Sequence, residues 1–303
     1  MAIGIRLTVD FAFKQTLGNP QYTDVTVHFL NSVLQPKSRI ESVEILNPTL
    51  PKESESHKES LLDILAVDER GCRLNIEMQT SLPGNLRRRL VYYTSRLFYG
   101  QLQEGEDYDL LRAAINICVV DRPLIVDPPQ LHRDFRLRDS QGESLCDDFQ
   151  LHLLQLPFAQ ATEHNAHALP GIEQWAFFLR NAHHYDAETL CRILPDPVFT
   201  KALEIVTMIA KTPEQRYYYE ARLKAQRDEA ARLAFAREEG LEAGRAAGHA
   251  EGLDLGETIG RIGLLREILG DVPETTAELR TWSRERLIEL LAELESRWER
   301  VTS

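Results

Sequence analysis

The chain has 303 residues, of which 43% are hydrophobic and 27% charged, so it can bury a full core and has the composition of a globular protein with one large domain or two. Its net charge of −12 argues against a protein that coats nucleic acid nonspecifically, because Lys and Arg on phosphates supply most of that affinity. We expect a soluble, cytoplasmic protein without a membrane span, because the first residues lack a signal-peptide pattern and no later stretch approaches eighteen uncharged apolar residues.

The first predicted elements are two helices and a strand. Thr8 or Asp10 is expected to cap a helix that ends at the Gly-Asn-Pro of 18–20. Apolar residues at helical spacing predict a second helix over about 23–35. Residues 39–46 then alternate as a strand does, and a polar, Pro-containing loop leads on to the next element.

The most informative stretch is LLDILAVDERGCRLNIEMQ, residues 61–79. Apolar and β-branched residues alternate on both sides of a charged, Gly-containing turn at 68–71, which predicts a β-hairpin. The alternation places Asp63 among apolar neighbours on one arm, and Glu77 and Gln79 on one face of the other. Since burying a carboxylate is costly unless it is paired or binds a cation, the two acidic residues predict a metal site.

Further elements follow the hairpin in an alternating order. A helix is expected over 83–103 and a buried strand over 113–120, with additional strands over 132–137 and 150–156. From about residue 170 a helical region begins, whose aromatic face is expected to pack in the core. The periodicity of the apolar residues by itself predicts only that the N-terminal half is a mixed α/β domain.

The C-terminal part has a different character. Residues 212–263 are rich in Ala, Arg and Glu, and glycines recur at every fourth position from 240 to 260. Each interior Gly costs a helix about 0.8–1 kcal/mol relative to Ala, so something must offset the repeat. Small residues at this spacing allow two helices to approach closely, which favours a homo-oligomer through the C-terminal helices; the alternative is a frayed or disordered linker. A last helix is expected over 282–298.

The spacing of Asp63 and Glu77-Met78-Gln79 resembles the D…(D/E)-x-K constellation of the PD-(D/E)XK phosphodiesterase superfamily. More specifically, the chain is similar to the recombination-promoting nuclease, or putative transposase, family, which carries Gln where most relatives carry Lys. Other pieces of the resemblance, in family order, are DFAFK, LLDILAVDERG, NIEMQ, Arg89 and YYTSRLFYGQLQEGEDY. Together they cover roughly residues 9–120.

This resemblance implies an α/β fold with an αβββαβ restriction-endonuclease-like core, in which helices flank a mixed sheet, followed by an α-helical C-terminal region. We assign residues 1–160 to the nuclease-like domain, 161–211 to a helical extension and 212–303 to a helical tail that forms oligomers. The activity implied is a metal-dependent DNA endonuclease with a part in recombination or mobile-element biology. The alternative is a non-catalytic protein of nuclease fold that acts in DNA binding or assembly.

The resemblance also implies roles for individual residues. Asp63 and Glu77 would hold Mg²⁺ (or Mn²⁺), with the backbone carbonyl of Met78 as a further ligand. Gln79 is a catalytic candidate, although an amide orients groups only by hydrogen bonding and leaves the general base unassigned. Asp10 is either an additional metal ligand or the N-cap of the first helix.

Contacts to DNA are expected from Lys14, Arg89 and Tyr93, the last two lying four residues apart on one helix. A solvent-exposed lysine is the other interpretation of Lys14. Arg87 and Arg88 are expected to meet solvent or backbone instead.

Several other chemistries lack a signal. No phosphate-binding GxxxxGK[ST] loop and no GxGxxG after a strand is present, so we expect no nucleotide cofactor. The nine histidines form no HExxH, and His164 with His167 and His183 with His184 are interpreted as loop residues. The four cysteines are far apart and expected to be reduced.

Overall fold

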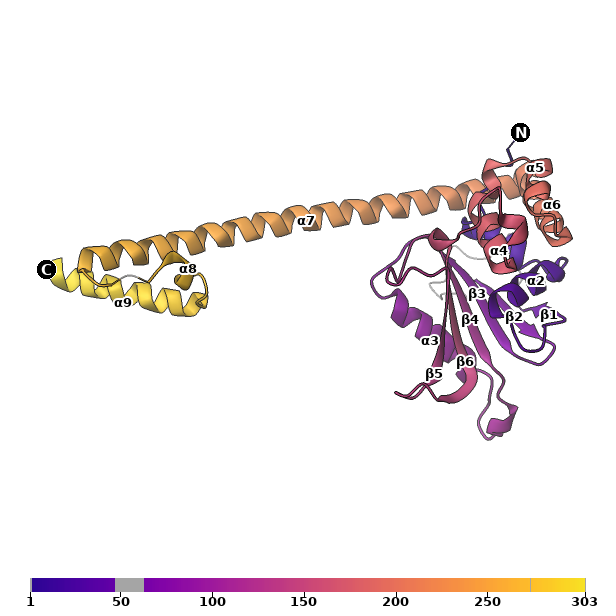
Figure 1. Cartoon of the computed structure of the whole chain (residues 1–303), viewed down its shortest axis with the longest axis horizontal. Coiled ribbons are helices and arrows are strands. Elements are labelled where there is room, and N and C mark those ends of the chain that lie inside the picture. The colour runs from indigo at the N-terminus through magenta and orange to yellow at the C-terminus, as the bar shows by residue number, and fades with distance from the viewer. Residues whose placement is uncertain (1, 47–62, 273, 303) are drawn as a thin grey trace. The chain divides into compact units, whose positions relative to one another are not determined.

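The chain is described by a computed structural model over residues 2–46, 63–272 and 274–302 (Figure 1). Its contacts divide it into two compact units, residues 1–228 and 229–303. Leu61 and Leu62 of the predicted hairpin, and the loop before them, lie outside the described residues.

A six-stranded mixed sheet forms the centre of the 1–228 unit, in the order β1-β2-β3-β4-β6-β5. The strands are β1 (Val43–Ile45), β2 (Ile64–Asp68), β3 (Arg73–Gln79), β4 (Ala114–Val120), β5 (His132–Arg138) and β6 (Ser144–Gln155). β3 and β6 run parallel to β4, and the other pairs are antiparallel. Every residue of β4 is buried, as expected of a strand in the middle of a sheet covered on both faces.

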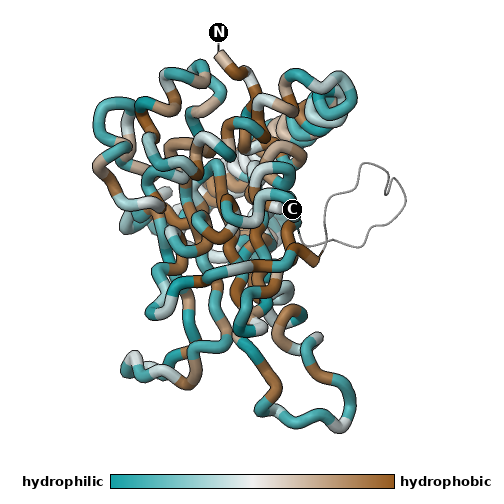
Figure 2. The backbone as a smooth tube through the Cα atoms, turned by 90° about the vertical axis from the view of Figure 1, so that its right-hand side faces the viewer, coloured by the Kyte–Doolittle hydropathy of each residue, from teal (hydrophilic) through white to brown (hydrophobic). Residues whose placement is uncertain are grey.

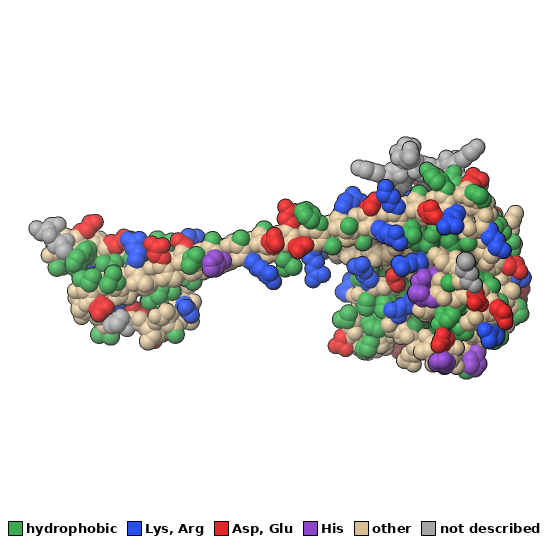
Figure 3. Space-filling view, turned by 90° about the horizontal axis from the view of Figure 1, so that it is seen from above, with side chains coloured by type: hydrophobic (Ala, Val, Ile, Leu, Met, Phe, Trp, Pro, Cys, Tyr) green, Lys and Arg blue, Asp and Glu red, His purple; other side chains and the backbone are tan. Residues whose placement is uncertain are grey.

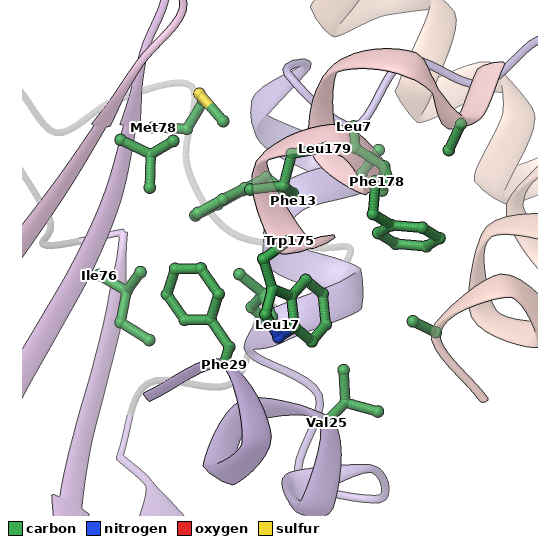
Figure 4. Packing of buried hydrophobic residues seen from close by; sticks show 14 of the residues in the cluster. Leu7, Phe13, Leu17, Val25, Phe29, Ile76, Met78, Trp175, Phe178 and Leu179 are labelled. Atoms are coloured by element: carbon green, nitrogen blue, oxygen red, sulfur yellow. The ribbon is translucent and has the colours of Figure 1, made fainter. Parts of the chain in front are cut away.

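Helices cover both faces of this sheet. On one face lie α1 (Asp10–Leu17), α2 (Thr23–Leu34), α4 (Gly171–Asn181) and α6 (Pro197–Lys211), with the short α5 (Ala187–Ile193) beside α6. Phe13, Phe29 and Trp175 are fully buried there against Ile76 (Figure 4). On the other face α3 (Leu86–Tyr99) packs through Leu86 and Leu90 against β4 and β6. The hydropathy colouring of Figure 2 follows this arrangement, with apolar segments along the strands and the helices that cover them.

The order of helices and strands confirms the predicted α/β class and its αβββαβ core. The hairpin is also as predicted: Ile64 pairs with Ile76 and Leu65 with Asn75 across β2 and β3. Its turn closes through the Gly71 N–H, which donates to the Asp68 carbonyl at 2.9 Å. Gly71 has φ +83°, a conformation that favours glycine.

Several element ends differ from the prediction; the first strand, for example, is shorter than the predicted 39–46 and spans only Val43–Ile45. The N-cap of α1 is Val9, and neither Thr8 nor Asp10 caps it by a side-chain hydrogen bond, so the expected cap was wrong. α3 ends at Tyr99 rather than Gln103, because Gly100 takes the C-cap position. β6 begins at Ser144, six residues before the predicted strand, because its first part pairs with the end of β5 beyond a bulge.

The 229–303 unit is helical. It contains most of α7 (Pro213–Leu269), the short α8 (Thr276–Leu279) and α9 (Arg284–Thr302). Ile262, Leu279, Leu287 and Leu294 form its small core, and Arg297 pairs with Asp271 at 2.7 Å. The glycine repeat lies inside α7, and a Cβ added at any of its six glycines would meet no atom within 4 Å. Among the described residues, no helix is long and apolar enough to cross a bilayer.

Candidate active site

The two predicted acidic residues lie on neighbouring strands. Asp63 directly precedes β2, and continuing the Ile64–Ile76 register by one residue brings it opposite Glu77 of β3. Opposed residues of an antiparallel pair point to the same face, so the two carboxylates converge. Oδ2 of Asp63 also accepts a hydrogen bond from the Met78 N–H at 3.2 Å. The hairpin register thus brings together the pair that the sequence predicted.

Lys14 reaches this site from α1. Its Nζ lies 3.1 Å from Oδ1 of Asp63 and 3.1 Å from Oδ1 of Asp10, one helical turn away. Burial opposes the charged ammonium, but the two carboxylates outweigh it, and the net result is a raised pKa for Lys14. The Lys14 ammonium therefore stands as a fixed positive charge between Asp10 and Asp63.

Burial dominates the electrostatics of both acidic groups. It raises the pKa of Asp63, against the lowering effect of Lys14. It also raises the pKa of Glu77 to about 7, with a further increase from Asp63, whereas Gln79, Arg89 and Asn116 lower it. Only 4% of Glu77 is exposed, and its Oε1 has no hydrogen-bond partner among the described residues. A divalent cation would satisfy that oxygen and hold the carboxyl ionised at neutral pH.

Gln79 and Met78 flank this carboxylate. The Gln79 side-chain amide donates to Oε2 of Glu77 at 3.1 Å, which fixes the orientation of this carboxylate. Met78 points to the opposite face, where its side chain joins the core under α1 and α2 (Figure 4). Cys118, opposite Glu77 on β4, is buried, and this burial together with the acidic neighbours raises the pKa of its thiol. A protonated thiol is no nucleophile, so Cys118 is a packing residue.

Arg89 and Tyr93 of α3 lie on the Glu77 side of the sheet. The Arg89 guanidinium stands 5.6 Å from the centre of the Tyr93 ring, and its charge lowers the pKa of Glu77. Arg87 differs from them, since its side chain donates to the Leu124 carbonyl at 3.0 Å. Among the described residues, no three His, Cys, Asp or Glu side chains form a ready metal cluster. Asp63 and Glu77 thus form a pair of carboxylates without a third such side chain beside them among the described residues.

Two pairs of polar side chains, one fully buried and one partly buried, were not predicted from the sequence. The Asn75 side chain donates to the Asn116 side chain at 2.9 Å between β3 and β4, one step along the sheet from Glu77. His132 and His152 stack and are joined by a 2.9 Å hydrogen bond between β5 and β6. Both pairs depend on the strand order, which a single sequence does not reveal. The sequence offered one sign of such pairs, namely a polar residue within an apolar strand.

The sheet order, the flanking helices and the acidic pair at the end of the hairpin define a nuclease-type α/β fold. A family model described as PD-(D/E)XK nuclease family transposase matches residues 7–236, and the chain belongs to that family. No curated protein and no solved structure matches the chain significantly.

Proposed function

We propose that this protein is a metal-dependent DNA endonuclease that acts in the cytoplasm, in recombination or mobile-element biology. The observation that carries the proposal is the buried carboxylate of Glu77, which has a free oxygen and a pKa raised to about 7, opposite the carboxylate of Asp63. A buried, poorly satisfied acidic pair is expensive for the fold and is typical of a cation-binding site. Family membership supports the nuclease class.

Asp63 and Glu77 would hold Mg²⁺ or Mn²⁺, hard cations that bind carboxylate and carbonyl oxygens, with the Met78 carbonyl as a further ligand. When bound, the cation would polarise the scissile phosphate and make a water molecule more acidic. Asp10 is the more exposed candidate, with 38% of its side chain open to solvent against 18% for Asp63. Its role would be to hold Lys14 in place.

Lys14 would supply the positive charge that the Gln79 amide lacks. Most superfamily members carry Lys at the Gln79 position, and here an ammonium from α1 reaches Asp63, the acidic partner of Glu77. Lys14 would attract the phosphate and stabilise charge that builds on it, while Gln79 keeps Glu77 oriented. Arg89 and Tyr93 would contact the DNA backbone beside the site.

The experiment is a plasmid assay with the full-length protein. Supercoiled DNA is incubated with Mg²⁺ or Mn²⁺ and wild type, Asp63→Asn, Glu77→Gln or the control Glu44→Gln, whose side chain is exposed on β1. Metal-dependent nicking that both site variants lose and the control keeps is the expected result. Equal behaviour of all four proteins would leave a non-catalytic DNA-binding protein as the better description, and cleavage of RNA in preference to DNA would change the substrate class.

We also propose that α7 pairs with a second copy of the chain through its glycine repeat. The repeat costs the helix roughly 5 kcal/mol relative to Ala, and no residue in the described part of the chain packs against the six glycines. Gly248→Leu has room within the chain and favours the helix, so it should keep the fold but lower the oligomer mass in analytical ultracentrifugation. Ala246→Leu, next to the stripe on an equally exposed position, is the matched control. An unchanged mass for Gly248→Leu would end this proposal.

A further inference from the structure

The outer face of α3 carries alternating basic and aromatic side chains. Arg88, Tyr92, Arg96 and Tyr99 follow one another at intervals of four, four and three residues, so they form one stripe along the helix, the Arg–Tyr stripe. All four are exposed, with 58% of Tyr92 and 86% of Tyr99 open to solvent. The buried side of α3 consists of other residues: Leu86, Leu90, Thr94 and Leu97.

This stripe is not explained by the packing of the chain. Neither Arg88 nor Arg96 forms an ion pair with any residue that the structure describes. No acidic residue occurs from Met78 to Gln103, although the chain as a whole has a net charge of −12. On the face of the 1–228 unit drawn in Figure 3, acidic and basic side chains are interspersed, so an uninterrupted basic helix is a local feature. Its charge is complementary to a polyanion.

The Arg–Tyr stripe is continuous with the candidate active site. The Tyr92 ring lies 5.8 Å from that of Tyr93, and the Arg89 guanidinium stands over Tyr93. Arg89 in turn lies close enough to Glu77 to lower its pKa. A chain bound along the stripe would therefore lead directly to the two carboxylates.

We propose that the Arg–Tyr stripe binds single-stranded DNA next to the cleavage site, so that the substrate of this nuclease carries an unpaired segment. The inference rests on the proposed function for the identity of the polymer. Tyrosine rings exposed on a helix offer flat faces on which unpaired bases stack, while guanidinium groups between them contact phosphates. In a duplex the base faces are hidden and only edges are offered, which tyrosine rings read poorly. Two helical turns, about 10 Å, separate Tyr92 from Tyr99, so the rings would stack on different bases.

The sequence that follows α3 limits the path that a bound DNA strand can take. Glu104, Glu106, Asp107 and Asp109 follow within ten residues of Tyr99 and would repel phosphates. The bound DNA strand is therefore expected to leave α3 near Tyr99. It would be held mainly by Tyr92 and by the two arginines of the stripe, Arg88 and Arg96. Tyr108, which is 80% exposed between two of these aspartates, provides an exposed tyrosine in an acidic setting.

The test measures binding without cleavage. Full-length protein in EDTA is titrated into a fluorescently labelled single-stranded DNA, its duplex and an RNA of the same sequence, with anisotropy as the readout. Tyr92→Leu should weaken single-strand binding about tenfold, in line with the loss of one stacked base, and should leave duplex binding almost unchanged. Arg88→Ala with Arg96→Ala should reduce the slope of log affinity against log salt for the single strand by about 1.4, the value for two phosphate contacts.

Matched controls accompany both variants. Tyr108→Leu removes a tyrosine that is 80% exposed, against 58% for Tyr92. Lys37→Ala with Arg39→Ala removes the same charge from an exposed segment before β1. Neither control should change single-strand binding. Equal effects of Tyr92→Leu and Tyr108→Leu, equal loss of duplex and single-strand binding, or tighter binding of RNA than of DNA would each overturn the inference.

The two proposals fail in different ways. Binding is measured without metal, so it does not depend on cleavage. If the protein never cuts plasmid but Tyr92→Leu weakens single-strand binding as expected, the proposed nuclease activity is overturned and the proposed binding surface stands. If the wild type cuts plasmid, but wild type and Tyr92→Leu bind single-stranded DNA equally well, only the proposal about the Arg–Tyr stripe is overturned. Circular dichroism of each variant checks the fold, which substitution of exposed residues is expected to preserve.

Discussion

Lys14 and Asp63 form an ion pair of 3.1 Å that joins the first helix of the chain to the β2 end of the hairpin. Both side chains are about four-fifths buried, so each depends on the other to remain charged inside the fold. Lys14→Met would leave Asp63 without its cation. We expect the free energy of unfolding to fall by about 1–3 kcal/mol and plasmid cleavage to be lost.

Urea unfolding at neutral pH measures the stability change for Lys14. Lys14→Arg keeps the charge and is expected to retain most of the stability, and Lys37→Met is a control on an exposed lysine. Full stability of Lys14→Met would show that Asp63 is protonated or otherwise satisfied in the native protein.

Glu77 should make the metal-free protein less stable as pH rises. Its folded pKa of about 7 lies above its ordinary value of 4.5, so the stabilising contribution is complete below about pH 4.5 and is lost as pH rises toward and through 7. The difference of about 2.5 pKa units corresponds to about 3 kcal/mol. Glu77→Gln should flatten the dependence of the urea midpoint on pH between about 5 and 8.

A divalent cation should reverse this trend for Glu77. If it binds the ionised carboxylate, the rise in melting temperature on adding Mg²⁺ grows with pH in wild type and disappears in Glu77→Gln. Glu44→Gln should behave as wild type. A Mg²⁺-induced rise that survives in Glu77→Gln would place the cation elsewhere.

Arg89 should set the acid limit of activity through Glu77. The guanidinium lowers the pKa of Glu77, so Arg89→Met raises that pKa further and shifts the acid limb of the rate profile toward higher pH. We expect activity near pH 7 to fall about three- to tenfold and to recover partly at higher pH. Arg89→Lys keeps the charge and should restore the profile, whereas a uniform loss at all pH values would assign Arg89 to substrate contact alone.

His152 should have the opposite effect on stability to that of Glu77. Burial, together with His132 and Arg136, lowers the pKa of His152 to about 3, so the stability from its neutral form is present above about pH 6.5 and declines as pH falls toward 3. At pH 5 wild type should be about 2 kcal/mol less stable than at pH 7 through this group. His152→Gln should remove this part of the acid sensitivity, with exposed His164→Gln as the control. Equal acid sensitivity in the two variants would contradict the assignment.

The sequence predicted those features of the site that follow from local patterns, within one hairpin or one helix. Alternation around the turn at Gly71 sets the hairpin register, and that register alone brings Asp63 opposite Glu77. The helical spacing within α3 likewise predicts that Arg89 and Tyr93 share a face, and they do. These relationships need no knowledge of the strand order.

What sequence missed depends on contacts between distant segments. The ion pair of Lys14 with Asp63 was not predicted, because nothing in DFAFK reveals that this ammonium would meet a carboxylate on another element. The His132–His152 pair was overlooked in favour of His183 and His184, because adjacent histidines attract attention and a cross-strand pair is visible only once β5 is known to lie beside β6. The cap expected at Asp10 was wrong for a local reason: Val9 occupies the N-cap position, and Asp10 is already the first residue of the helix.

The two outer strands of the sheet have a consequence for colloidal behaviour. β1 has only three residues, and β5 is interrupted by register shifts on either side of Leu137. Short and irregular borders offer a poor template for strand addition, which protects a sheet protein against edge-to-edge aggregation. Soluble expression at high concentration should therefore tolerate changes on the helices better than changes that lengthen or regularise β1 or β5.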